Sequence, residues 1–404
     1  MKKILFLLSV VLTVGCTSSH EKNPQLLLIS FDGFRADYLL KTDTPNFDKL
    51  VKNGVTAEGL IPIFPTKTFP NHYAIATGLY PENNGLIGNS MYDPEMDAKY
   101  SMGNREAVEN AEWYLGEPIW NTVEKAGKKA GTMFWIGSEA PLQNMRPTHW
   151  KSYDGRIPNE ARIDTVLQWM TSNNEPVDFG TVYFSFVDSQ GHRFGPDSDE
   201  VIEAIQKADS LVGYLMNELK RVDPEGNINL MIVSDHGMIE VSPDKRVVLD
   251  DYIDVTNIDV ISYSPALMFN MKESGDKAEI YSALKAGQDH YKVYSKEDIP
   301  ERYHLKNNIR TPDFLMVADE GYTINTKEYF ESRGNNYPSG GAHGFDNSNI
   351  KMDALFVAYG PAFQKRVKLD RIENIHLYEV MAKILHVKPA PNDGSINSVK
   401  EILK

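Results

Sequence analysis

The sequence predicts an α/β protein with a mostly parallel central sheet flanked by helices. Short apolar runs without polar alternation recur along the 404 residues, and such runs are typical of strands buried on both faces. Stretches with helical character lie between the runs. This alternation favours a doubly wound sheet, in which ligands bind beyond the carboxyl ends of the strands.

Four apolar runs are the predicted strands, and three of them end in acidic residues. They read "QLLLISFDG", "GTVYFSFVDSQGH", "INLMIVSDHG" and "DALFVAYGP". The first run ends at Asp32, the second at Asp188, and the third at Asp235 and His236. The helical stretches between the runs cover residues 118–126, 159–170 and 199–221.

Composition and charge narrow the class of protein. Hydrophobic residues make up 41% and charged residues 24% of the chain, which is ordinary for a globular protein with a sizeable core. The net charge is -14 and there is no long basic run, so polymeric nucleic acid is not an expected partner. A small anionic substrate stays compatible, because a local cationic centre can outweigh a distant acidic surface. No obligate protein partner is inferred.

The N-terminus is typical of a targeting segment. Lys2 and Lys3 precede an apolar stretch at residues 4–14, and Gly15 precedes Cys16, the only cysteine. We expect residues 1–15 to be a lipoprotein-type signal peptide, with a lipidated Cys16 anchoring an exported protein to a bacterial membrane. An ordinary signal peptide with an incidental Cys16 is the alternative. With no second cysteine, no disulfide framework stabilises the chain.

The remaining chain is expected to form one body. Residues 16–24 are the predicted tether, and residues 25–404 are predicted to be a single domain. Residues from about 270 to 335 are more polar and irregular, which indicates an inserted cap region.

Each candidate site residue has an ordinary structural explanation when taken alone. An aspartate after a strand is commonly a turn or cap residue. Thr68 could cap a helix that has proline in its first turn. Together, however, the strand ends bring Asp32, Asp188, Asp235 and His236 to one edge of the sheet, with histidines on nearby loops. Those histidines are His192 and His343.

Three carboxylates and three imidazoles match the ligand chemistry of zinc, and they are enough for two metal ions roughly 4 Å apart. Thr68 then gains a chemical role, because metal coordination lowers the pKa of a hydroxyl enough to make it a nucleophile. The start of a helix adds backbone N–H groups for an anionic phosphate. Two divalent ions and three aspartates leave a centre of about +1, which suits an anionic ester.

Four separated motifs resemble those of the nucleotide pyrophosphatase/phosphodiesterase family of the alkaline phosphatase superfamily. They are "FPTKTFPNHYAIATGLYPENNGLIGNSMYDP", "DSQGHRFGP", "VSDHGM" and "GGAHGFDN". The resemblance runs from about Gln25 to Pro361. It implies an alkaline phosphatase-like fold, two Zn²⁺ per chain and hydrolysis of nucleotide phosphodiester or pyrophosphate bonds. The implied products are nucleoside 5'-monophosphates, released through a phosphothreonine intermediate.

The resemblance also implies a role for each metal ligand. One zinc ion would be held by Asp188, His192 and His343, and the other by Asp32, Thr68, Asp235 and His236. Thr68 is the implied nucleophile, and Asn89 is the implied donor to a phosphate oxygen.

Substrate-binding residues follow from the same resemblance. Phe69 matches an aromatic residue that stacks on a nucleobase, and Tyr153 is the expected second aromatic residue. Lys151 is the third candidate, because monoester-cleaving relatives use cationic groups in this part of the chain. His72 is expected to be structural, one turn inside the helix.

Two alternatives stay open at this point. A phosphomonoesterase, or a phosphodiesterase acting on choline-type lipid head groups, would keep the same scaffold and chemistry. A surface binding protein without catalytic activity is the alternative of another class.

Overall fold

The computed structural model describes residues 24–404. Its central sheet has eight strands, which are β1 (Gln25–Phe31), β2 (Val55–Ala57), β6 (Ala130–Met133), β7 (His149–Lys151), β8 (Phe179–Phe184), β9 (Ile228–Val233), β18 (Phe356–Tyr359) and β19 (Val367–Leu369). The strand order is β19-β2-β18-β9-β1-β8-β6-β7. From β9 to β7 all neighbours are parallel, whereas β18 is antiparallel to both β9 and β2. The predicted mostly parallel sheet is confirmed.

Strand β1 shows why these apolar runs have no polar alternation. Leu26 and Leu28 belong to one hydrophobic core, while Leu27 and Ile29 belong to a second core on the other face of the sheet. All four side chains are buried. Burial of a leucine or isoleucine side chain contributes about 1.5–3 kcal/mol, so a polar residue on either face would be costly.

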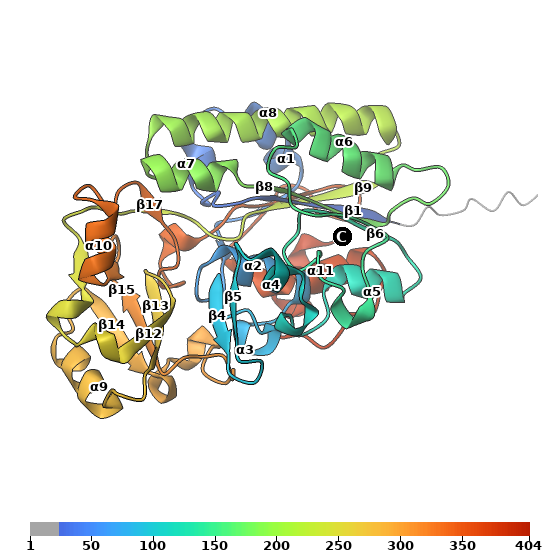
Figure 1. Cartoon of the computed structure of the whole chain (residues 1–404). Coiled ribbons are helices and arrows are strands. Elements are labelled where there is room, and N and C mark those ends of the chain that lie inside the picture. The colour runs from blue at the N-terminus through green and yellow to red at the C-terminus, as the bar shows by residue number, and fades with distance from the viewer. Residues whose placement is uncertain (1–23) are drawn as a thin grey trace, which may run out of the picture.

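Helices cover both faces of the sheet (Figure 1). On one face lie α1 (Pro45–Asn53), α6 (Asn159–Met170), α7 (Phe186–Phe194) and α8 (Asp199–Val222). On the other face lie α2 (Thr68–Thr77), α5 (Ile119–Lys125) and α11 (Leu377–Ile384). The helices predicted at residues 118–126, 159–170 and 199–221 correspond to α5, α6 and α8. Helix α8 begins after Ser198, whose hydroxyl accepts a hydrogen bond from the Val201 N–H.

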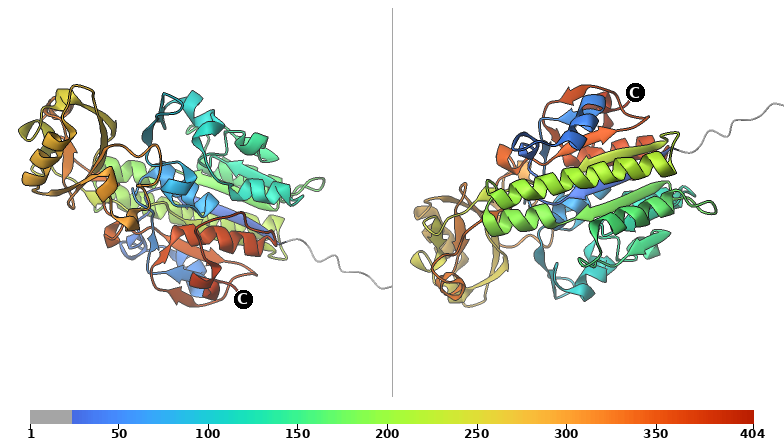
Figure 2. Two further views of the ribbon diagram at one scale, coloured as in Figure 1. Left: turned by 90° about the horizontal axis from the view of Figure 1, so that it is seen from below. Right: turned by 90° about the horizontal axis from the view of Figure 1, so that it is seen from above.

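A second, antiparallel sheet stands beyond the end of the central sheet (Figures 1 and 2). Its order is β12-β13-β15-β14, and the strands are β12 (Ile258–Ser262), β13 (Ala266–Met271), β14 (Tyr291–Ser295) and β15 (Phe314–Ala318). Nearby are α9 (Lys277–Ala286), α10 (Lys327–Arg333) and the parallel pair of β11 (Arg246–Val248) and β16 (Thr323–Asn325). This unit has its own hydrophobic core. It overlaps the cap region predicted at residues 270–335, and the domain boundaries stay a prediction.

The remaining short elements connect these layers. They are α3 (Pro81–Asn84), α4 (Arg105–Glu109), and the strand pairs β3 (Leu60–Ile61) with β20 (Ile372–Glu373), β4 (Ser90–Asp93) with β5 (Ala98–Ser101), and β10 (Ile239–Glu240) with β17 (Gly341–Ala342).

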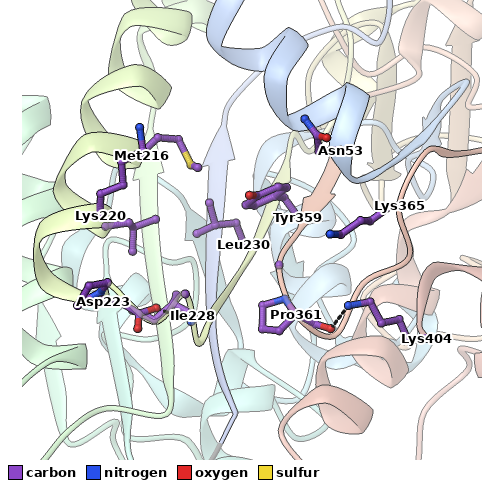
Figure 3. A pocket seen from close by; sticks show the side chains of 14 residues that line it. Asn53, Met216, Lys220, Asp223, Ile228, Leu230, Tyr359, Pro361, Lys365 and Lys404 are labelled. Atoms are coloured by element: carbon purple, nitrogen blue, oxygen red, sulfur yellow. Dashed lines mark hydrogen bonds between the residues drawn. The ribbon is translucent and has the colours of Figure 1, made fainter.

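A cavity of about 380 Å³ lies at the amino end of β9 (Figure 3). Ile228 and Leu230 of β9, Met216 of α8 and Tyr359 of β18 contribute to its lining. No residue of the predicted site lines it. Since ligand sites in such sheets lie beyond the carboxyl ends of the strands, the site must be sought at the other end.

The predicted signal peptide at residues 1–15, the predicted lipidation site Cys16 and nearly all of the predicted tether lie outside the described residues. Within residues 24–404, no helix combines the length and the apolar character needed to cross a membrane.

Arg310 joins the second sheet to the main body. This arginine is 6% exposed and donates to Asp93 Oδ2 over 2.6 Å. It also donates to the carbonyls of Gly85, Glu112 and Trp113 over 2.6–3.0 Å. The guanidinium group thus connects the loop before β15 to several segments of the body.

We predict that Arg310→Met will lower the free energy of unfolding by about 3–5 kcal/mol, because it leaves Asp93 as a buried charge without its partner. Arg302→Met is the matched control, since the Arg302–Asp346 pair is much more exposed and an exposed pair contributes about 1 kcal/mol or less. Chemical denaturation of both variants measures the difference. Equal losses in the two variants would contradict the role assigned to Arg310.

Candidate metal centre and adjoining cavity

The predicted acidic edge exists at the carboxyl ends of β1, β8 and β9. Asp32 follows β1, and Asp235 and His236 follow β9. These three residues are at most 2% exposed. His236 Nε2 lies 3.0 Å from Asp235 Oδ2 and 3.5 Å from Asp32 Oδ1. Because β1 and β9 are parallel neighbours, their carboxyl ends deliver these groups to one place.

Asp188 and His192 reach the same edge from helix α7. The expectation that His192 lies on a loop is wrong, because α7 starts at Phe186, directly after β8, and contains both residues. Their i, i+4 spacing puts both on one helix face, and His192 Nε2 lies 3.4 Å from Asp188 Oδ1. His343 is on the loop after β17, as expected, with Nε2 3.9 Å from the same oxygen.

Each of the three carboxylates has one buried oxygen without a hydrogen-bond donor. These atoms are Asp32 Oδ1, Asp188 Oδ1 and Asp235 Oδ2. In Asp32 and Asp235 the other carboxylate oxygen accepts a hydrogen bond. The Tyr183 hydroxyl donates to Asp32 Oδ2 over 2.5 Å, and the Gly33 N–H donates to Asp235 Oδ1 over 3.1 Å. A buried, unpartnered carboxylate oxygen is costly. These three oxygens are therefore suited to bind cations.

The three imidazoles are oriented by their backbone partners. Nδ1–H donates to a carbonyl in each ring: Gly341 for His192 (2.9 Å), Gly237 for His236 (2.9 Å) and Thr66 for His343 (2.8 Å). This bond fixes the tautomer, so Nε2 keeps its lone pair. The same arrangement orients histidine ligands in metal sites.

Burial and neighbouring charges shift the pKa values in this cluster in both directions. Although burial opposes it, the charge of Asp235 raises the pKa of His236. Burial, together with the negative charges of Asp235 and Asp188, raises the pKa of Asp32 well above its ordinary value. Burial, together with the charges of His236 and His192, lowers the pKa of His343 well below its ordinary value. A neutral imidazole is the form that binds metal, and a bound cation would favour ionised carboxylates.

Three sets of residues could each hold a metal ion, because within each set the ligand atoms lie within 4.8 Å of one another. One group is Asp188, His192 and His343, a second is Asp32, Asp188 and His236, and a third is Asp32, His72 and Asp235. Donor atoms of this kind, in this number, could hold metal ions.

His72 lies beneath the cluster, and protein groups engage both of its ring nitrogens. Nε2 lies 2.8 Å from Ser30 Oγ, and Nδ1 lies 3.0 Å from the Thr68 carbonyl. The ring is buried one turn into α2. Its contacts therefore position the helix that carries Thr68.

Thr68 lies at this cluster of carboxylates and imidazoles, with Oγ1 3.2 Å from His236 Nε2. The helix-cap role considered for Thr68 is not seen, because Lys67 occupies the cap position and Thr68 is the first residue of α2. The Thr68 hydroxyl is consequently directed to the cluster and not used to cap the helix.

A cavity of about 290 Å³ adjoins this hydroxyl, and we call it the threonine cavity. It is lined by Thr68, Asp32 and Asp188 together with the two predicted aromatic residues, Phe69 and Tyr153. Tyr153 is 46% exposed, so its ring stands at the opening.

The other two predicted residues differ in their placement. Asn89 is close to Thr68, because its Oδ1 accepts from the N–H of the next residue, Phe69, over 3.0 Å, which leaves its NH₂ group as a donor. Lys151 is exposed on β7 and does not line the threonine cavity.

Sequence reasoning missed several groups of the site. Tyr183, the donor to Asp32, lies inside an apolar run where nothing distinguishes it from a core residue. Glu139, which is paired with Arg105, and Trp135 line the threonine cavity. Lys67 directly precedes Thr68, and only its position in the sequence could have drawn attention to it.

Comparisons with known proteins agree with this geometry. The family model described as type I phosphodiesterase / nucleotide pyrophosphatase matches residues 26–346. The chain is 40% identical over 403 residues to human ectonucleotide pyrophosphatase/phosphodiesterase family member 1, covering 96% of this chain but 43% of that protein. It is 36% identical over 400 residues to human family member 5, covering 99% of this chain and 82% of that protein.

A solved structure of a family member is also similar to this chain. Inactive murine ectonucleotide pyrophosphatase/phosphodiesterase 5, in complex with AMP, superposes with a TM-score of 0.88 and 34% identity, covering 94% of this chain and 100% of that one. The chain thus spans less than half of the first relative and nearly all of the solved one. It belongs to the type I phosphodiesterase / nucleotide pyrophosphatase family.

Proposed function

We propose that this protein is a two-zinc phosphodiesterase and nucleotide pyrophosphatase that releases nucleoside 5'-monophosphates. One observation carries the proposal: the Thr68 hydroxyl lies 3.2 Å from His236 Nε2, beside three buried carboxylate oxygens that lack a donor. An alcohol in such a place is suited to attack an anionic phosphate once cations are bound. The murine relative in complex with AMP supports a nucleotide as the substrate.

The donor set fits two zinc ions. We assign Asp188, His192 and His343 to one ion, and Asp32, Thr68, Asp235 and His236 to the other. When bound, the two ions would supply Lewis-acid chemistry, lowering the pKa of a hydroxyl and offsetting the charge of the phosphate.

The reaction consists of two displacements at phosphorus, the first by Thr68 and the second by water. Thr68 Oγ1 attacks phosphorus, its proton passes through solvent to the leaving oxygen, the bond from phosphorus to that oxygen breaks, and a phosphothreonine forms. The Asn89 NH₂ group is placed to donate to a phosphate oxygen. Water then attacks phosphorus, the bond to Thr68 Oγ1 breaks, and Thr68 regains a proton. Each turnover consumes one water.

The threonine cavity would hold the nucleoside that stays on the transferred phosphate. Phe69 and Tyr153 line it and offer two aromatic faces, and stacking between a base and an aromatic ring is worth about 1–3 kcal/mol. Lys151 stays a tentative contact, because its side chain is exposed on β7.

The export and anchoring of the protein are part of the same proposal. The expected lipid on Cys16 would hold the domain at a bacterial membrane through the short tether, in the periplasm or on the cell surface.

Removal of the nucleophile tests the mechanism. We expect Thr68→Ala to lower kcat on a nucleotide diester at least about 10³-fold, as loss of a nucleophile does in other hydrolases, while metal analysis still finds close to two zinc ions per chain. Thr165→Ala is the control, because Thr165 lies on α6 and its hydroxyl donates to a carbonyl of that helix. Near wild-type activity in Thr68→Ala would exclude Thr68 as nucleophile.

Substrate choice tests the diester assignment. We expect kcat/KM for bis-p-nitrophenyl phosphate to exceed that for p-nitrophenyl phosphate, and a dinucleotide to be cleaved faster than glycerophosphocholine. Faster cleavage of the monoester would favour a phosphomonoesterase, and faster cleavage of glycerophosphocholine would favour a choline-type phosphodiesterase. No turnover of any ester by zinc-loaded protein would leave the binding protein as the better interpretation.

Replacement of the lipidation residue tests the anchor. In a bacterial host, Cys16→Ser should move the protein from the membrane fraction to the soluble fraction and abolish labelling with a radioactive fatty acid. A wild-type protein that is already in the soluble fraction and takes up no fatty-acid label would favour an ordinary signal peptide.

A further inference from the structure

The cavity of about 380 Å³ at the amino end of β9 carries three lysines, and we call it the amino-end cavity (Figure 3). They are Lys220 in the last turn of α8, Lys365 on the loop after β18, and Lys404, whose Nζ donates to the Pro361 carbonyl over 2.6 Å. All three are exposed, and within residues 24–404 no carboxylate forms an ion pair with any of them. In a chain of net charge -14, three such cations around one cavity indicate an anionic ligand.

Among the described residues that line this cavity, Asp223 is the one acidic side chain. Its Oδ1 accepts from the side-chain amide of Asn227 over 3.1 Å, and its Oδ2 accepts from the Ile228 N–H over 2.8 Å. These bonds hold the turn between α8 and β9. Since the carboxylate is engaged there, the cavity keeps an excess of positive charge.

The floor of the amino-end cavity is apolar. Ile228, Leu230 and Leu219 line it and are at most 8% exposed. Met216 and the ring of Tyr359 lie beside them and are half-buried. Exposed cations around an apolar floor suit a ligand that joins an anionic group to hydrocarbon, because the two parts meet surfaces of matching polarity.

The amino-end cavity is joined to the first residue of β1. Gln25 pairs with Ile228 of the cavity lining. Asn229 is 1% exposed and connects both sides, because its Nδ2 donates to the Gln25 carbonyl over 3.0 Å and its Oδ1 accepts from the Ala362 N–H over 2.8 Å. Gly360, at φ +140°, permits this contact, since a Cβ there would lie 2.8 Å from Asn229 Cα. The entry of the chain and the cavity thus belong to one rigid surface.

The proposed lipid anchor would bring this surface to a membrane. Only residues 17–24 separate Cys16 from β1, and a fully extended chain spans at most about 3.6 Å per residue, or roughly 30 Å here. The start of β1 and the end of α8 lie at the end of the molecule opposite the second sheet (Figures 1 and 2). A lipidated Cys16 would therefore hold the amino-end cavity within reach of the lipid head groups.

We infer that the amino-end cavity binds the head groups of anionic phospholipids in the membrane that carries the anchor. The inference rests on the anchor in the proposed function and adds a fixed orientation of the domain on the bilayer. The lipid phosphate meets the three ammonium groups, and the adjoining hydrocarbon lies on the apolar floor. Strand β9 has six residues, so its carboxyl end, with the cluster of carboxylates and imidazoles, is about 20 Å further from the bilayer. The threonine cavity is thereby kept clear of the membrane surface.

Energy transfer from the protein to the bilayer tests this orientation. Cys16 is the only cysteine and its thiol would carry the lipid, so a cysteine introduced by Asn217→Cys or Glu273→Cys can be labelled alone. Asn217 is exposed on α8 next to Met216, and Glu273 is exposed between β13 and α9. The full-length lipidated protein is inserted into vesicles with an acceptor dye on the head groups. With phosphatidylglycerol present, we expect strong transfer from position 217 and weak transfer from position 273, and with phosphatidylcholine alone the transfer from position 217 should fall.

Replacement of the three lysines tests the cavity itself. One lysine near an anionic bilayer contributes about 5-fold to binding. The triple variant Lys220→Gln, Lys365→Gln and Lys404→Gln should therefore lower the ratio of docked to undocked molecules on the order of 100-fold, and bring the transfer from position 217 to its value in phosphatidylcholine. Its kcat/KM on a soluble nucleotide ester should equal that of the wild type, because none of the proposed catalytic residues lines this cavity.

A second triple variant, Lys272→Gln, Lys285→Gln and Lys327→Gln, is the matched control. It removes the same charge from exposed lysines near the second sheet and should keep the transfer from position 217. Equal transfer from positions 217 and 273, or an equal loss in the two triple variants, would overturn the assignment of the amino-end cavity while leaving the proposed hydrolase and its anchor intact. A wild type without a fatty-acid label would overturn the anchor and this inference with it, whereas the hydrolase is tested separately by Thr68→Ala.

Discussion

The site depends on the accumulation of negative charge at the ends of three adjacent parallel strands. Strands β9, β1 and β8 are neighbours, and the chain places an aspartate just beyond each of them. Burial and mutual repulsion make this arrangement unfavourable without a counter-charge, as the raised pKa of Asp32 indicates. Divalent cations remove that cost, so the same feature that weakens the metal-free cluster gives it affinity for metal.

Close backbone packing makes this accumulation of aspartates possible. Gly33 follows Asp32 at φ +67°, and a Cβ at this position would lie 2.9 Å from Asp188 Cα. A side chain there would separate the first two aspartates. The Asp188 N–H in turn donates to the Asp32 carbonyl over 3.0 Å. The glycine of "SFDGF" is thus explained by the approach of β1 to α7, a contact between residues more than 150 positions apart.

The sequence was sufficient to predict the sheet and the acidic edge, because both depend on local patterns. Runs such as "QLLLISF" are apolar at every position, and the residues after them fall at a strand end wherever the strand is placed. The placement of His192 was predicted less well, because the apolar run continues past β8 through Phe186 and Val187 and so hides the start of α7. Tyr183 could not be assigned, since its hydroxyl reaches the cluster only by donating to Asp32 Oδ2.

The rings of His236 and His343 connect the two sets of ligands that we assign to the two ions. They stack with centroids 3.6 Å apart and planes at 10°, although one follows β9 and the other follows β17. Each ring is also fixed at Nδ1 by a carbonyl, of Gly237 and of Thr66. The second of these carbonyls belongs to the segment that leads into Lys67 and Thr68. The position of that one segment therefore sets both the Thr68 hydroxyl and the His343 ring.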